Sequence, residues 1–221
     1  MSALTESKFI GLKKPKETIE DFQGCGINSL LTLLQHIEPT HQISVDDCKK
    51  IFGYDKDGIS EQRYNFNKFN NLLKDNRIPY KIHMGTFNSH QEILKYLTYP
   101  VPVYFSMKVI NFIKDKFKYS PVNINFGDGS SLFESSNHHL LLLVGYEESG
   151  TKLYFVDPVY QLPYYSEKDL STKEKLCVLN TQQFYECVKH IKSFMELRHH
   201  QKLEKSYKTE KKKNEKQSRL E

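Results

Sequence analysis

The stretch Gln23-Gly24-Cys25-Gly26-Ile27-Asn28-Ser29-Leu30-Leu31 places a thiol between two glycines at the start of an apolar helical pattern. The pattern continues at i, i+3, i+4 spacing to Ile37 and is stopped by Pro39, which predicts a helix that begins just after Gly24. A helix start presents unpaired backbone N–H groups and the positive end of the helix dipole, and both favour a thiolate over a thiol. Cys25 is therefore a candidate nucleophile; the alternative is a small core cysteine.

A thiolate nucleophile needs a base, and the base needs a group that orients it. His138 and His139 precede an aliphatic run, and Asp157 follows the next predicted strand. The two strands, 139–146 and 152–156, form a hairpin that brings His139 and Asp157 to the same end. A one-residue slip or bulge decides which histidine shares a face with the aspartate, so this spacing leaves His138 open as well. The alternative is a surface histidine pair beside an Asp-Pro turn.

The other patterns predict helices first and strands later, which favours an α+β fold with a mostly antiparallel sheet. Ser44 and Asp47 form a capping box before a short helix. Segments 158–175 and 108–137 are predicted as loops. The second is rich in aromatic residues; it is either a surface excursion that these residues anchor, which we favour, or a loop that covers a substrate. The remaining predicted elements are helices from Ser60, after Ser89 and from Thr181 to Met195, and strands at 80–84, 101–107 and 177–179.

The charge of the chain is concentrated at its carboxyl end. The sequence has 221 residues and a net charge of +5, and segment 198–221 alone holds nine Lys or Arg and four Asp or Glu. The rest of the chain is therefore neutral, which argues against a nucleic-acid-binding domain with a basic face. We expect a lead-in at 1–22, one domain at 23–197, and a Lys-rich tail at 198–221 that is a frayed helix or disordered.

Signals for export, membranes and cofactors are missing from the sequence. The first sixteen residues contain no apolar stretch of signal-peptide length, and the longest aliphatic run, 140–144, is too short to span a bilayer. The four cysteines lack metal-site spacing, and Gly127-Asp128-Gly129 lacks the lysine of a phosphate-binding loop. We expect no cofactor, no metal and no membrane span. The expected location is the cytoplasm, or a host cell reached through a secretion system that needs no signal peptide.

Outside its two ends, nearly the whole chain resembles a known family. It is similar to the papain-like cysteine peptidases that process double-glycine leaders of bacteriocins, in their stand-alone form. The matching segments are the C-G-x-x-S-L motif at 25–30, the helix and turn at 43–53 and 57–58, the strand at 99–103, and the histidine and aspartate strands at 139–146 and 154–158. In the third of these, Tyr99 stands where relatives usually have glycine.

The resemblance implies a papain-like fold in which an N-terminal helical part carries Cys25 and a mostly antiparallel sheet carries His139 and Asp157. It implies that Cys25 is the nucleophile, His139 the general base and acid, and Asp157 the orienting group. It selects His139 over His138 because the Gly-Tyr pair falls six positions beyond it. Relatives carry an oxyanion-hole glutamine several residues before the cysteine. Here position 19 is Ile19, and the nearest candidate is Gln23.

These residues predict a cysteine peptidase, or a related thiol amide hydrolase, that acts on a protein or peptide through an acyl-enzyme. Asn28, Ser29 and Asp128 are further candidates for lining the cleft. Transglutaminase or deamidase activity needs the same thioester and stays open. A third alternative is a catalytically weak peptide-binding module, because the oxyanion-hole glutamine is displaced. A small peptidase-like chain with a Lys-rich end also suits the role of a bacterial effector. The sequence leaves the oligomeric state open.

Overall fold

The computed structural model describes residues 7–20, 24–54, 66–106, 109, 138–188 and 191–199, the side chain of His138 excepted. The helices are α1 (Cys25–Ile37), α2 (Val45–Phe52), α3 (Phe66–Asp75), α4 (His90–Leu94), α7 (Glu167–Leu170) and α8 (Thr181–Val188), with 3-10 turns η3 (Glu148–Gly150) and η4 (Lys173–Lys175). The strands are β1 (Lys8–Phe9), β2 (Tyr80–Thr86), β3 (Val101–Ser106), β4 (His138–Glu147), β5 (Lys152–Val156), β6 (Cys177–Asn180) and β7 (Ser193–His199).

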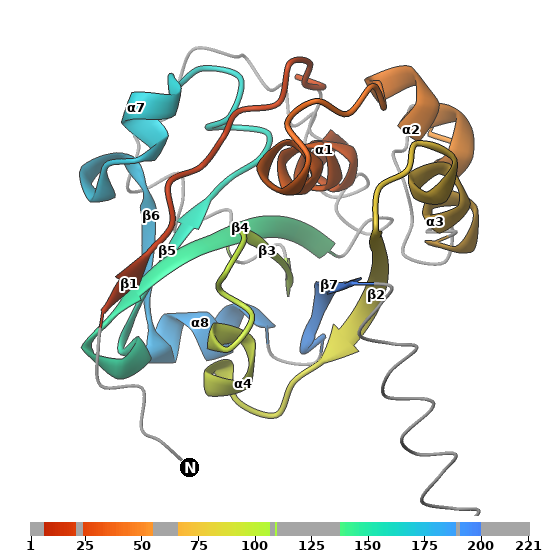
Figure 1. Ribbon diagram of the computed structural model, residues 1–221. Coiled ribbons are helices and arrows are strands. Elements are labelled where there is room, and N and C mark those ends of the chain that lie inside the picture. Colours follow the sequence, from red (N-terminus) through yellow and green to blue (C-terminus); the bar gives the residue numbers. More distant parts are fainter. Residues whose placement is uncertain are drawn as a thin grey trace, which may run out of the picture.

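The strands form one sheet in the order β2-β7-β3-β4-β5-β6, and β1 pairs with Gly145 and Tyr146 near the end of β4. Every pairing in this sheet is antiparallel. Figure 1 shows α1, α2 and α3 on one side of the sheet and α4 and α8 on the other. The prediction of an α+β fold, with a helical part followed by a mostly antiparallel sheet, is confirmed.

Apolar side chains of the sheet pack against both helical layers. On β4, Leu140 belongs to the cluster that α1, α2 and α3 share, and Leu141 and Leu143 belong to the cluster under α4 and α8. This alternation is the period of two that a strand buried on both faces requires. The continuous aliphatic run of the sequence is therefore explained by burial on two sides rather than by a membrane. None of the helices in the described part has the length and apolar character that crossing a bilayer demands.

The lead-in is part of the core. Beyond β1, the backbone N–H of Ile10 donates to Val144 O at 2.8 Å, and the Leu12 and Ile19 side chains are buried. Figure 1 shows this segment running from β1 toward α1. Residues 7–20 contain no helix, but they are more firmly packed than their polar composition indicates.

The capping box before α2 is confirmed. The Ser44 hydroxyl accepts a hydrogen bond from the Asp47 backbone N–H at 3.1 Å, and the Asp47 carboxylate accepts one from the Ser44 backbone N–H at 2.9 Å. The Ser44 backbone and hydroxyl donors hold the pKa of Asp47 below its usual range. Gly53, at φ +61°, then ends the helix in the left-handed conformation that glycine adopts most easily.

The predicted last helix is wrong in its second half. α8 ends at Val188, and Met195 lies in β7 instead. The reason is tertiary: β7 pairs with β2 along its full length and touches β3 on its other side, so sheet hydrogen bonds replace helical ones. The cap is also displaced, because Asn180 and Gln183, rather than Thr181, exchange the hydrogen bonds of a capping box at 2.9 Å each.

Two further differences concern segment ends. The predicted loop at 158–175 contains α7, which begins with a capping box between Ser166 and Asp169. β7 includes Arg198 and His199, which were expected to open the tail. Segments 60–65, 110–137 and 200–221, on which several predictions fall, lie outside the described residues.

Candidate active site

Cys25 is the first residue of α1, and Gly24 before it provides no side-chain cap. The side chain of Cys25 is partly buried and packs against both hydrophobic clusters, so it lies where the two clusters meet. A Cβ atom at Gly24 would lie 2.6 Å from Cβ of Ile19. Glycine at this position therefore lets the lead-in lie directly against the residue that precedes the thiol.

His139 and Asp157 form a buried pair. The distance from His139 Nε2 to Asp157 Oδ2 is 2.8 Å, and neither side chain is exposed to solvent. Two groups that would be costly to bury separately thus satisfy one another. The pair joins β4 to the residue that directly follows β5.

A β-bulge sets the register between these strands. Leu143 pairs with Phe155, but the next pair is Gly145 with Tyr154. Val144 is therefore an extra residue on β4, with no counterpart on β5. Such an insertion changes which side chains of β4 share a face with those of β5 on the far side of the bulge.

The bulge decides which of the two neighbouring histidines meets the aspartate. Continuing the register beyond the bulge places Asp157 opposite Leu141, on the face that His139 shares. Without the extra residue, Asp157 would lie opposite Leu142, and the face of His138 would be the matching one. The geometry of the hairpin therefore selects His139 independently of any resemblance.

The carboxylate of Asp157 is held from two sides. Its Oδ1 atom accepts hydrogen bonds from the backbone N–H groups of Val159 at 2.8 Å and Tyr160 at 2.9 Å. The Asp157 backbone N–H donates to Gln161 Oε1 at 2.6 Å, and Gln161 Nε2 donates to Lys175 O at 2.6 Å. These bonds fix the turn after β5 and leave Oδ2 for His139.

The imidazole of His139 also has the Cys25 side chain near it, and this thiol contributes to raising its pKa. Because Nε2 faces Asp157, Nδ1 is the ring nitrogen left for the thiol. Burial lowers the pKa of His139, but the charge and hydrogen bond of Asp157, together with those of Cys25, outweigh it and raise the pKa to about 10. Both neighbours thus favour the protonated form of the imidazole, which lies between a carboxylate and a sulfur atom.

The structure thus brings together Cys25, His139 and Asp157 from three separate parts of the chain. Gln23 lies outside the described residues. Ile19, at the position where glutamine was sought, has no side-chain donor, and its backbone N–H donates to Asn28 Oδ1 at 2.8 Å.

Asn28 and Ser29 are completely buried, so neither lines an open cleft as the sequence suggested. Gln161, whose side chain accepts a hydrogen bond from the Asp157 backbone N–H, was not predicted from the sequence. The signal that was available for Gln161 was a polar residue four positions after an Asp-Pro turn, which is too common to single out.

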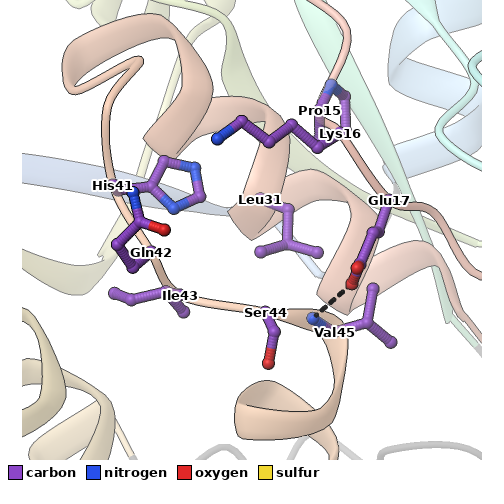
Figure 2. A pocket seen from close by; sticks show the side chains of 9 residues that line it. All are labelled: Pro15, Lys16, Glu17, Leu31, His41, Gln42, Ile43, Ser44 and Val45. Atoms are coloured by element: carbon purple, nitrogen blue, oxygen red, sulfur yellow. Dashed lines mark hydrogen bonds between the residues drawn. The ribbon is translucent and has the colours of Figure 1, made fainter.

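A pocket on another part of α1 is separate from this arrangement. Figure 2 shows Lys16 and Glu17 of the lead-in on one side, His41 and Gln42 on the other, and Leu31 between them. None of Cys25, His139 and Asp157 lines it. Within the described ranges, no three His, Cys, Asp or Glu side chains gather as a metal site would need.

Comparison with known proteins supplies the family. A family model described as "Peptidase_C39 like family" matches residues 10–192, which is most of the chain. Neither the search of curated proteins nor that of solved structures finds a match. The match starts in the lead-in and includes α1 and both strands of the hairpin, in agreement with a papain-like α+β fold. On this match, the chain belongs to the Peptidase_C39-like family of cysteine peptidases.

Proposed function

We propose that this protein is a cysteine peptidase that forms a thioester between Cys25 and the acyl part of a protein or peptide substrate. The observation that carries the proposal is the position of the His139 imidazole, which meets Asp157 through Nε2 at 2.8 Å and lies close enough to Cys25 for the thiol to raise its pKa. A cationic imidazole beside a thiol stabilises the thiolate, which is the nucleophilic form.

Acylation would proceed in two steps. The Cys25 sulfur forms a bond to the scissile carbonyl carbon, and the electron pair of the C=O double bond moves to the oxygen. When the double bond forms again, the C–N bond breaks, and the leaving amine takes the proton that His139 holds on Nδ1. The products of this stage are a free amine and a thioester on Cys25.

Deacylation consumes one water molecule. The neutral His139 removes a proton from the water, whose oxygen bonds to the thioester carbon, and the Cys25 thiolate then leaves. Throughout, Asp157 holds the imidazole with Nε2 toward the carboxylate, so that Nδ1 faces the sulfur. The net reaction is hydrolysis of one peptide bond with no change in redox state.

The developing oxyanion needs hydrogen-bond donors. Backbone N–H groups at the start of α1 are free of helical partners and lie beside the sulfur, which makes the Cys25 N–H the first donor in the proposal. Gln23 is proposed as the second. Ile19 supplies no donor, so this part falls to Gln23, and losing one donor of this kind lowers the rate by roughly 100- to 1,000-fold.

Transfer to an amine and deamidation of glutamine would use the same thioester, and one experiment separates them from hydrolysis. Wild-type protein, Cys25→Ala and Cys48→Ala are incubated with a peptide mixture and a labelled primary amine, and the products are read by mass spectrometry. We expect new peptide N-termini with wild type and Cys48→Ala, and none with Cys25→Ala. Amine incorporation without new N-termini would show a transferase instead, and conversion of glutamine to glutamate would show a deamidase. No product at all would support a peptide-binding module.

A further inference from the structure

We infer that Asn28 is a positioning residue that fixes the helix of Cys25 against the turn that carries Asp157. The inference rests on the proposed function, because it assigns Asn28 a part in holding the reacting groups at their working distance. Asn28 itself touches neither the sulfur nor the imidazole in the contacts described above.

The Asn28 side chain is completely buried and uses its amide in three hydrogen bonds. Nδ2 donates to Pro158 O at 2.9 Å and to Ile19 O at 2.7 Å, and Oδ1 accepts from the Ile19 backbone N–H at 2.8 Å. Both amide protons are therefore used on backbone carbonyls. One side chain joins three segments, namely α1, the lead-in and the turn after β5.

The position of these bonds connects them to the chemistry. Asn28 lies three residues after Cys25, about 4.5 Å along the axis of the same helix. Pro158 directly follows Asp157, whose carboxylate is fixed to its own turn by two backbone N–H groups. The bond from Asn28 to Pro158 therefore joins two rigid units, of which one carries the thiol and the other the group that orients His139.

The partners of Asn28 would be left without hydrogen bonds if its amide were removed. Two buried carbonyls and one buried N–H would then favour a small separation of α1 from the turn, so that water or new partners can reach them. A displacement of about 1 Å between reacting groups can cost roughly 100-fold in rate. The separation would first lengthen the distance between Cys25 and His139, because Cys25 belongs to α1 and His139 is oriented by Asp157 in the other unit.

Thr32 offers a matched control in the same helix. It is also completely buried, and its hydroxyl donates to the backbone oxygen of Asn28 at 2.7 Å. Thr32→Val removes this bond without touching the bond to Pro158. It should destabilise α1 while leaving the relative positions of Cys25 and Asp157 intact.

The test measures the alkylation rate of Cys25 by iodoacetamide from pH 5 to pH 9 in wild type, Asn28→Ala, Asn28→Ser and Thr32→Val. Circular dichroism and thermal unfolding report whether each variant is folded. We expect Asn28→Ala to react at least 10-fold more slowly than wild type at pH 6 and at a similar rate at pH 9. Asn28→Ser, which keeps one donor, should fall between them, and Thr32→Val should follow wild type at every pH.

A wild-type pH profile in folded Asn28→Ala would overturn the inference and leave the proposed function standing. Should Asn28→Ala not fold, the profile of Asn28→Ser decides in the same way. If wild type itself reacts like an ordinary thiol at pH 6, the proposed function fails, and the inference fails with it.

Discussion

His139 and Asp157 lie eighteen residues apart in the chain, yet their side chains meet at 2.8 Å where neither is exposed to solvent. The hairpin between them accounts for most of this approach, and the bulge at Val144 accounts for the choice of face. A buried ion pair of this kind is costly to assemble and more costly to break, because removal of one partner leaves an uncompensated charge. The proposed chemistry requires this pair, because Asp157 orients the His139 imidazole toward Cys25.

Replacement of the two neighbouring histidines should have opposite results. His139→Ala removes the proposed base and should lower kcat/KM by roughly 1,000-fold or more. His138→Ala changes the adjacent residue and leaves the bond between His139 and Asp157 in place, so its activity should stay within a few-fold of wild type. Peptide cleavage by the two variants, compared at equal folded concentration, checks this. Equal losses in both would contradict the register argument.

Asp157→Asn should shift the pH dependence of activity. The aspartate charge raises the pKa of His139, so a neutral amide of the same shape should lower it. The protonated imidazole that acylation needs would then be lost at a lower pH. We therefore expect the alkaline limb of the kcat/KM profile to move toward lower pH in Asp157→Asn.

The same shift affects stability, with a definite sign. The pKa of His139 is raised from 6.5 to about 10 in the folded protein, so its contribution to the free energy of unfolding is fully present below about pH 6.5 and lost as the pH rises through about 10. Urea unfolding at several pH values should show this decline in wild type and a weaker one in Asp157→Asn. An unchanged alkaline limb together with an unchanged stability profile would count against the pairing.

Gln161 is expected to matter for stability more than its position in a turn indicates. Gln161→Leu is close in size but leaves the Asp157 N–H and the Lys175 carbonyl without their bonds. The Asp157 N–H is buried, and an unsatisfied buried group costs about 1–3 kcal/mol, so the midpoint of urea unfolding should fall. A midpoint equal to that of wild type would show that the two groups find other partners.

The sequence was sufficient where local pattern and tertiary structure agree. The start of α1, the two strands of the hairpin and the capping box of α2 follow from residue spacing and from the preferences of Ser, Asp and Gly. That Cys25 lies near the end of the hairpin was inferred from residue types. The structure brings Cys25, His139 and Asp157 together. The family match over residues 10–192 agrees with the resemblance to cysteine peptidases that the sequence motifs indicated.

The remaining features depend on contacts between distant segments. Met195 continues a helical spacing in the sequence, but pairing with β2 places it in a strand. The Val144 bulge leaves no mark in the sequence, because a run of aliphatic residues reads the same in either register. The role of Asn28 was missed for a similar reason, since its partners are backbone atoms nine and 130 residues away.

Gly24→Ala tests the packing of the lead-in against the start of α1. The added methyl group would lie 2.6 Å from Ile19 Cβ and 3.2 Å from its carbonyl oxygen, so the lead-in must move. Overpacking of this kind typically costs about 1–3 kcal/mol. Thermal unfolding should show the loss, and limited proteolysis should cut the lead-in sooner than in wild type. An unaltered cleavage rate would mean that the segment yields without detaching.

The most direct test of the account is the pH dependence of alkylation at Cys25 compared with Cys48 in the folded wild-type protein. Burial, together with the charge of Asp47, raises the pKa of Cys48 to about 12, so Cys48 should remain unlabelled throughout. Cys25, beside the cationic His139, should react rapidly near pH 6, and His139→Ala should abolish that low-pH reaction. Labelling of Cys25 that is as slow as that of Cys48 at pH 6, or that is unaffected by His139→Ala, would contradict the proposed pair.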